Sequence, residues 1–270
     1  MDEWIRQTIV DSMADFGRQP GIHSAWKDPL VAYADARDPL FPRLKEVATP
    51  GHFTPVELLD SAQTVIVYFL PFAESIGRSN KGDGLASLEW AWAYIETNRL
   101  IVAINQRLAE GLEQKGYASV VLPPTHNFDT KELVSQWSHK HIGYIAGLGK
   151  FGLHHMLITE RGSSGRLGSL ITRASIPPTS RRDQEACLYT YNRSCVACVK
   201  SCPVAALTEE GFDRHKCYAR LLQNAKEFER EGLGDVCGKC VSVVPCSFQD
   251  PVARLLTSPA QQHPRQAPHP

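Results

Sequence analysis

The stretch CVACVKSCP, residues 195–203, places three cysteines within eight positions and follows the last one with a proline. Five further cysteines complete the set. All eight lie between Cys187 and Cys246, whereas residues 1–186 contain none. The full pattern is Cys187-x7-Cys195-x2-Cys198-x3-Cys202-Pro, then Cys217, then Cys237-x2-Cys240-x5-Cys246. The last 84 or so residues therefore carry a thiol chemistry that the first part of the chain lacks.

A 4Fe–4S cluster takes four thiolates, so eight cysteines are enough for two clusters. The ferredoxin run C-x2-C-x2-C-x3-C-P gives three cysteines to one cluster and its fourth to the other. Residues 195–203 reproduce the second half of that run, and Pro203 is expected to begin a helix over 203–207 that turns Cys202 away from its neighbours. We therefore expect a crossed assignment. The first quartet is Cys187, Cys195, Cys198 and Cys246, and the second quartet is Cys202, Cys217, Cys237 and Cys240.

Two other interpretations of the cysteines stay open. Two C-x2-C pairs can form a zinc site, although zinc uses four ligands and would leave the other four without a metal. The cysteines can also be structural or form disulfides. The element C-x3-C-P favours iron and sulfide over both. Cys246 fits the usual run least well, because Pro245 precedes it instead of following it.

The bulk composition is that of an ordinary globular protein. Of 270 residues, 43% are apolar and 21% are charged, and 29 basic residues balance 29 acidic ones. Nucleic-acid binders usually carry a basic excess, so this balance gives no general case for one. The N-terminus lacks the basic start of a signal peptide, and no apolar run approaches the ~18 residues of a membrane span. We expect a cytoplasmic protein, where thiols stay reduced and serve metal or redox chemistry.

The cysteine distribution predicts three regions. Residues 1–178 form an α/β cofactor- or substrate-binding domain, residues 179–256 a two-cluster domain, and the proline-rich residues 257–270 a disordered tail. The stretch IPPTSRRDQEA, residues 176–186, is the expected linker. The predicted fold class is α+β: an α/β layer domain followed by a small ferredoxin-like domain.

Alternating hydrophobic patterns place the elements of the first region. We expect helices near the N-terminus, over 87–117 and over 131–146. We expect strands within 61–72 and 118–124. Two more strands, at 155–159 and 167–173, are expected on either side of a turn.

A glycine-rich segment, AGLGKFGLHHMLITERGSSGRLGSLIT, spans residues 146–172. Glycine permits tight turns and the close approach of a ligand to the backbone. Its glycines are equally explained by two ordinary turns around a strand pair. The segment is thus a candidate cofactor site on composition alone.

Together, AGLGKFGLHHMLIT (146–159), GSSGRLGSLIT (162–172) and CxxCxxxCPVAAL (195–207) resemble the epoxyqueuosine reductase family and its relatives, the reductive dehalogenases. The resemblance implies a nitroreductase-like fold that binds cobalamin beside the nearer cluster. The clusters would then pass single electrons to the cobalt. The resemblance also implies a set of cofactor-binding positions, which are Gly147, Leu148, Gly149, Phe151, Gly152, His154, Arg166 and Gly168.

The candidate catalytic residues are Asp129, His139 and His141. The family carries an acidic proton donor before the glycine segment, and Asp129 is the nearest match, with spacing that departs from the family pattern. Asp129 is equally expected as the N-cap of the helix that starts at Lys131. Histidine suits proton transfer near neutral pH, yet both histidines can instead form a polar packing face.

The sequence thus predicts an iron–sulfur oxidoreductase that relays electrons through two 4Fe–4S clusters to a bound cobalamin, which reduces a substrate. The alternative is an electron-transfer protein that reduces a partner without substrate chemistry of its own. Expected partners are a low-potential donor such as ferredoxin or flavodoxin and a small-molecule or protein substrate. A tRNA partner is not favoured, because there is no basic excess and only about 24 residues follow Cys246.

Overall fold

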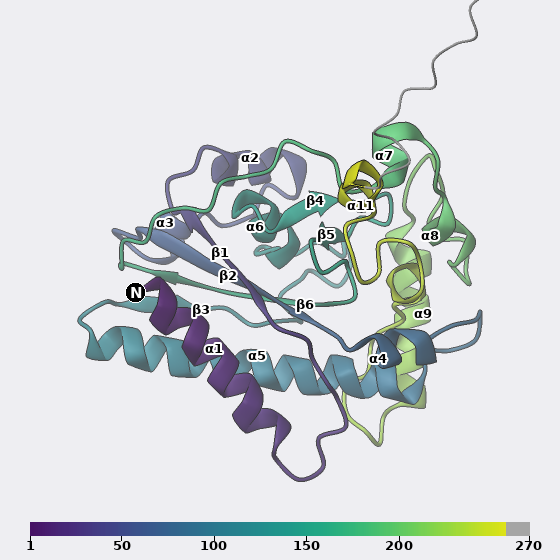
Figure 1. Ribbon diagram of the computed structural model, residues 1–270, viewed down its shortest axis with the longest axis horizontal. Helices are drawn as coiled ribbons and strands as arrows, with labels where there is room; N and C mark the ends of the chain where they lie inside the picture. Colours follow the sequence, from purple (N-terminus) through teal and green to yellow (C-terminus); the bar gives the residue numbers. More distant parts are fainter. Residues whose placement is uncertain (258–270) are drawn as a thin grey trace, which may run out of the picture.

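The computed structural model describes residues 1–257, and a four-stranded antiparallel sheet lies at the heart of the fold (Figure 1). Its strands follow the spatial order β1 (Leu30–Asp35), β2 (Thr64–Pro71), β6 (Gly165–Thr172) and β3 (Ser119–Val121). A separate two-stranded sheet pairs β4 (Gly149–Phe151) with β5 (Leu157–Thr159). Strand β6, the last in sequence, therefore occupies an inner position and brings the glycine-rich segment to the middle of the fold.

Strand β2 is buried on both faces, which explains its continuous apolar sequence. Successive side chains of a strand point to opposite faces of the sheet. Accordingly, one core takes Val65, Val67 and Phe69, and the other takes Ile66, Tyr68 and Leu70. Burial of each such side chain contributes about 1.5–3 kcal/mol, so this strand stabilises both layers at once.

Helices cover both faces of the sheet (Figure 1). On one face lie α1 (Asp2–Gly17) and α5 (Leu88–Gln114), and on the other lie α2 (Leu40–Val47) and α6 (His139–Ile145). The side chain of Ser87 caps α5 by accepting a hydrogen bond from the Trp90 backbone N–H. After α5, Gly116 adopts a φ of 83°, a left-handed conformation that glycine favours. These local signals agree with the helix that the sequence predicts.

The remaining helices are short, apart from α9. They are α3 (Pro55–Leu58), α4 (Glu74–Ser79), α7 (Leu188–Asn192), α8 (Ala197–Lys200), α9 (Arg214–Glu227), α10 (Lys239–Ser242) and α11 (Pro251–Thr257). The cysteine-bearing region packs tightly on the layered part. The backbone N–H of Ser163 donates to the Cys246 carbonyl over 2.9 Å, and Asn80 Nδ2 donates to the Cys237 carbonyl over 2.8 Å. Hydrogen bonds from two separate segments thus hold the second half of the cysteine set.

The mixed helix and strand class is confirmed. Two expected helices are wrong. Within the helix expected over 131–146, only His139–Ile145 is helical, because residues 131–138 form turns that hydrogen-bond to the loop before them. The helix expected over 203–207 is a turn. The strands at 155–159 and 167–173 exist but lie in different sheets. Strand β1 and helix α2 went unpredicted.

The domain boundary at 178/179 stays a prediction, and the expected tail lies, apart from Thr257, outside the described residues. Within residues 1–257, no helix combines the length and the apolar character needed to cross a membrane.

Candidate functional site

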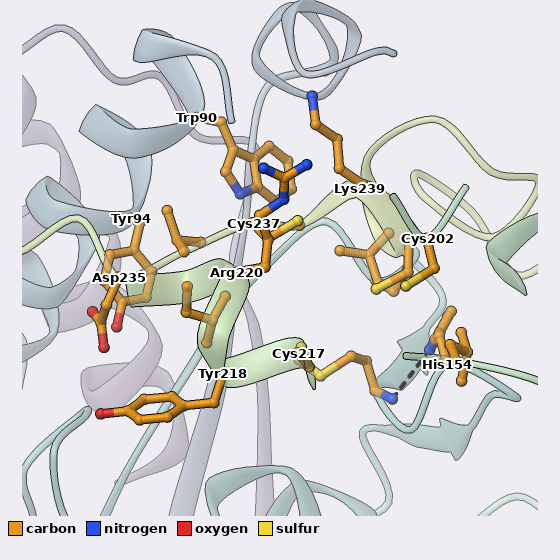
Figure 2. A pocket seen from close by; sticks show the side chains of 18 of the residues that line it. Trp90, Tyr94, His154, Cys202, Cys217, Tyr218, Arg220, Asp235, Cys237 and Lys239 are labelled. Carbon is orange, nitrogen blue, oxygen red and sulfur yellow. Dashed lines mark hydrogen bonds between the residues drawn. The ribbon is translucent and has the colours of Figure 1, made fainter. Parts of the chain in front are cut away.

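Four cysteines distant in sequence line a cavity of about 340 Å³ (Figure 2). They are the second quartet, Cys202, Cys217, Cys237 and Cys240. The first follows α8, the next lies on α9, and the last two lie at and just before α10. The opposite wall comes from the layered part of the fold, with Trp90 and Tyr94 from α5 and Arg166 from β6. The cavity therefore forms where the layered part and the cysteine-bearing region meet.

The other four cysteines, Cys187, Cys195, Cys198 and Cys246, line a second and smaller cavity. They come from the residue before α7, the residues around α8 and the segment after α10. His154 lines both cavities. The two quartets are neighbours, since Cys198 of the first is among the thiols whose charge raises the pKa of Cys240 in the second.

Burial makes these thiols hard to ionise. It is the main cause that raises the pKa of Cys198 and Cys217 to about 11 and that of Cys246 to about 12, and neighbouring thiols raise each of them further. None of the eight cysteines forms a disulfide. Thiolates in such places need a positive partner, and a metal centre supplies one because its ligands bind deprotonated.

Among residues 1–257, no three His, Cys, Asp or Glu side chains lie close enough to hold one metal ion. Each quartet instead surrounds a cavity. Four thiols around one space match the number of protein ligands that a 4Fe–4S cluster takes.

His154 connects the glycine-rich segment to the first quartet. It is 5% exposed, and burial, as the main cause, lowers its pKa to about 4, so the ring is neutral at pH 7. Its Nδ1 atom accepts a hydrogen bond from the Met156 backbone N–H over 3.1 Å. The ring hydrogen is therefore on Nε2, which lies 3.3 Å from Cys246 Sγ and donates to it.

Other parts of the chain fill the space beside several glycines of the predicted cofactor segment. A Cβ on Gly149 would lie 2.1 Å from the Ile158 carbonyl oxygen, and one on Gly168 would lie 2.3 Å from the Tyr68 ring. A Cβ on Gly152 would lie 2.8 Å from the His154 ring. Their absent side chains thus allow strand pairing, ring packing and the placement of His154.

Other residues of the predicted cofactor-binding set lie in different parts of the fold. Gly147 has a φ of 81° and packs on the backbone of Ser180, and Leu148 is buried in the core beneath the sheet. Phe151 lines a different cavity, of about 500 Å³, beside His141. Of the eight positions, His154 and Arg166 line the cavity of the second quartet.

Asp129 lines neither of the two cysteine cavities. It is exposed, and its Oδ1 accepts hydrogen bonds from the backbone N–H groups of Lys131 and Glu132, which lower its pKa. It therefore closes a local turn in the segment between β3 and α6. The geometry matches the capping alternative, with a turn in place of the expected helix.

His139 has both ring nitrogens engaged. Its Nε2 donates to the Pro123 carbonyl over 2.9 Å, and its Nδ1 accepts from the Ser169 hydroxyl, which in turn accepts from Trp137 Nε1. Burial lowers its pKa to about 4. These contacts give His139 a structural part, tying α6 to β6.

His141 differs from His139. Its Nδ1 contacts Ser138 Oγ over 2.7 Å, and its ring lines the 500 Å³ cavity together with Lys140. Burial and the charge of Lys140 lower its pKa to about 4. The three predicted catalytic residues therefore do not converge on one place.

Sequence reasoning missed several polar residues of the second quartet's cavity. Tyr94, Arg220 and Asp235 line it, and Asp235 is buried with one carboxylate oxygen unbonded. These positions belong to α5, to α9 and to the stretch before Cys237. No motif links them in sequence, so only their burial in the fold identifies them.

The chain joins a helix-covered antiparallel sheet to a region that carries two cysteine quartets, and solved structures of epoxyqueuosine reductases and reductive dehalogenases share its fold. No protein-family model matches the chain. An epoxyqueuosine reductase of Bacillus anthracis is 33% identical over 125 residues, which cover 43% of this chain and 30% of that protein. The chain thus spans less than a third of the curated relative it matches.

Two solved structures share the fold. An epoxyqueuosine reductase with a tRNA-Tyr epoxyqueuosine-modified stem loop matches with a TM-score of 0.55 and 19% identity over 91% of this chain and 66% of that one. A reductive dehalogenase, whose structure suggested a mechanism for B12-dependent dehalogenation, matches with a TM-score of 0.56 and 16% identity over 90% of this chain and 33% of that one. The resemblance seen in the sequence motifs is therefore confirmed in sequence and in fold.

Proposed function

We propose that the chain is an iron–sulfur oxidoreductase that delivers electrons to a molecule bound beside the second quartet. The observation that carries the proposal is the sorting of eight cysteines into two quartets around two adjacent cavities. The likeness to epoxyqueuosine reductases and reductive dehalogenases supports a reductase of the iron–sulfur and corrinoid type. It also supports a nitroreductase-like layer with a ferredoxin-like domain.

The donor set fits two 4Fe–4S clusters. Each cavity offers four thiols, and buried thiols gain most from the positive charge of iron. The first cluster would be held by Cys187, Cys195, Cys198 and Cys246, and the second by Cys202, Cys217, Cys237 and Cys240. When bound, such clusters accept and release single electrons at potentials set by burial and hydrogen bonds.

The arrangement of the two cavities supports one direction of electron transfer. The cavity of the second quartet is lined by the layered part as well, whereas that of the first is lined by residues 187–198 and 244–251 with His154. A low-potential donor such as ferredoxin or flavodoxin would therefore reduce the first cluster, which passes electrons to the second and so to the cavity. The chain's own residues shield this route from water, since Cys198, Cys246 and His154 are buried.

A corrinoid fits the described cavities less readily. The 340 Å³ cavity lies at the small end of the range for small-molecule sites. Cavities of about 500 Å³ and 230 Å³ adjoin it, and Phe128 lines all three. When bound, the corrinoid would supply the reducing metal, while the protein's residues orient the substrate.

The test is the visible spectrum of the anaerobically purified protein, with and without added cobalamin, alongside iron, sulfide and zinc analysis. Eight irons and a shifted cobalamin spectrum support a corrinoid-dependent reductase. Zinc without sulfide would overturn the iron–sulfur proposal. The tRNA stem loop of the structural neighbour calls for a parallel binding assay with such a stem loop, a partner that the neutral composition does not favour.

A second candidate function is electron transfer to a partner protein. The scattering of Asp129, His139 and His141 over separate places favours it, since no proton donor among them reaches the second quartet. Eight irons with an unchanged cobalamin spectrum, and reduction of a partner without substrate turnover, would support this function over the first.

A further inference from the structure

The cavity of the second quartet collects buried polar atoms that have no partner. Within residues 1–257, six buried side-chain nitrogen or oxygen atoms make no hydrogen bond. Four of them belong to residues that line this cavity, namely Trp90 Nε1, Arg166 Nε, Arg220 Nε and Asp235 Oδ1. A buried polar atom without a partner costs about 1–3 kcal/mol. Their concentration at one cavity indicates a bound polar group there.

Two of the four lie beside the cysteines. The Trp90 indole packs on the backbone of Gly238, directly after Cys237, and Arg220 lies on α9, three positions after Cys217. Trp90 and Arg220 therefore belong to the surroundings of the second cluster. The other two atoms call for a different ligand.

Asp235 and Tyr94 lie together at the end of the cavity away from Cys202 and His154 (Figure 2). Asp235 is 8% exposed. Its Oδ2 is 3.5 Å from His126 Nε2, and its Oδ1 makes no hydrogen bond, although the Tyr94 hydroxyl is a neighbour of the carboxylate. The Oδ1 oxygen can accept a hydrogen bond from a molecule in the cavity.

The Arg166 guanidinium group lies over the ring of Tyr94. Its guanidinium carbon lies 4.2 Å from the centre of the Tyr94 ring, a cation–π contact that fixes the side chain. One terminal nitrogen donates to the Pro124 carbonyl over 3.4 Å, and Nε keeps a hydrogen without an acceptor. An acceptor and a donor thus flank one aromatic ring.

The other walls of the cavity are aromatic and have few polar groups. They comprise Phe72, Trp90, Tyr94, Phe128, Phe212 and Tyr218. Aromatic walls suit a flat, conjugated molecule, and a cavity of about 340 Å³ that would also hold the second cluster leaves room only for a small one. At this end of the cavity the opposite charges of Asp235 and Arg166 offset each other, which favours a neutral ligand; the other two cationic side chains of the lining, Arg220 and Lys239, lie on the cysteine-bearing helices α9 and α10.

We propose that this end of the cavity binds a small, flat, neutral aromatic molecule whose polar edge donates a hydrogen bond to Asp235 Oδ1 and accepts one from Arg166 Nε. The inference rests on the proposed function, because it gives the chemical class of the molecule that the second cluster would face. Neither residue belongs to a cysteine motif, and both contact the ligand directly.

The probe is benzamide, which carries an N–H donor and a carbonyl acceptor on one flat ring. Its affinity for the anaerobically reconstituted full chain is measured by ligand-observed NMR and compared with that of benzoate, which has acceptors alone. We expect benzamide to bind at least about tenfold more tightly, because benzoate places a second carboxylate against Asp235. Equal binding of the two compounds would overturn the proposal.

Two near-isosteric variants test the named atoms. Asp235→Asn should weaken the binding of benzamide about tenfold. It should also remove the difference in affinity between benzamide and benzoate, since the asparagine amide introduced there can donate a hydrogen bond to the benzoate carboxylate. Arg166→Lys keeps the charge but lacks Nε, and should weaken both compounds. The matched control is Asp183→Asn, an exposed position in the segment before Cys187, which should bind as the unaltered chain does. Unchanged benzamide binding by Asp235→Asn in a folded protein would refute the assignment.

A second readout separates this inference from the proposed function. In the reduced protein, a paramagnetic second cluster would speed the relaxation of the benzamide ring protons, and Asp235→Asn should reduce that effect in step with the weaker binding. If benzamide binds more tightly than benzoate but its ring protons relax no faster, in protein that holds no iron, the ligand site is supported and the proposed electron-transfer function is refuted. If the benzamide ring protons relax faster and Asp235→Asn does not change this, the clusters are supported and the proposed ligand site is refuted.

Discussion

The Nε2–H of His154 donates a hydrogen bond to Cys246 Sγ across 3.3 Å. The contact joins two segments 92 residues apart, the glycine-rich segment and the end of the cysteine set. It depends on Gly152, since a Cβ there would meet the His154 ring at 2.8 Å. One glycine of the motif therefore positions the histidine that contacts a thiol of the first quartet.

Replacing His154 with phenylalanine should lower the midpoint potential of the first cluster and leave that of the second unchanged. A hydrogen bond to a cluster sulfur stabilises the more negative, reduced state, so its loss disfavours reduction. Potentials are read by EPR-monitored redox titration of the reconstituted protein. His155→Phe is the control, because His155 packs against Phe212 instead. A drop in both potentials, or in neither, would contradict this role of His154.

The two quartets predict which cluster each cysteine variant loses. Cys246→Ser should damage the first cluster and Cys202→Ser the second, because each removes a thiol from a different cavity. Iron analysis should show about four irons lost in each case, with different EPR signals remaining. If both variants lose the same signal, the crossed assignment is wrong.

Gly162→Ala should destabilise the protein more than Gly116→Ala. Both glycines have a left-handed φ, 86° and 83°, so each substitution costs about 1–2 kcal/mol of backbone strain. At Gly162 the new Cβ would also lie 2.3 Å from the Ser247 carbonyl oxygen, whereas at Gly116 it meets nothing within 4 Å. We expect about 1–3 kcal/mol of further loss at Gly162.

Urea unfolding of the two glycine variants measures the difference in the free energy of unfolding. An equal loss at both positions would show that the 162–165 turn can shift away from the segment after Cys246. A loss at Gly162 accompanied by loss of iron would link this turn to cluster retention.

His139 should make the folded state less stable as the pH falls. Burial lowers its folded pKa to about 4, below the ordinary value of 6.5, so between these values the unfolded chain binds more protons. The stability is fully present above pH 6.5 and declines below it, by about 1.4 kcal/mol at pH 5.5. Urea unfolding of His139→Gln at pH 7.5 and 5.5 should show a smaller difference than the unaltered chain. An unchanged difference would mean that His139 is protonated in the folded protein.

Local patterns in the sequence determined much of the framework. The alternation and length of the apolar runs predicted β2 and α5, because those elements bury residues at the periods that a strand and a helix require. The spacing of the cysteines grouped them into two sets of four, and the motifs 146–172 and 195–207 pointed to the reductases whose fold the chain shares.

Tertiary structure decided the rest. Strand β1 was missed because its signal is short, and residues 131–138 lack a helix because their hydrogen bonds go to the neighbouring loop. Glycines of the 146–172 segment pack against other parts of the chain, and Asp129 is exposed to solvent. Asp235 and Arg166 lie 69 positions apart and share no motif; they meet at one aromatic ring because α5, β6 and the stretch before Cys237 pack together. Spacing along a chain reveals ligands on neighbouring turns, whereas contacts between distant segments exist only once the core has formed.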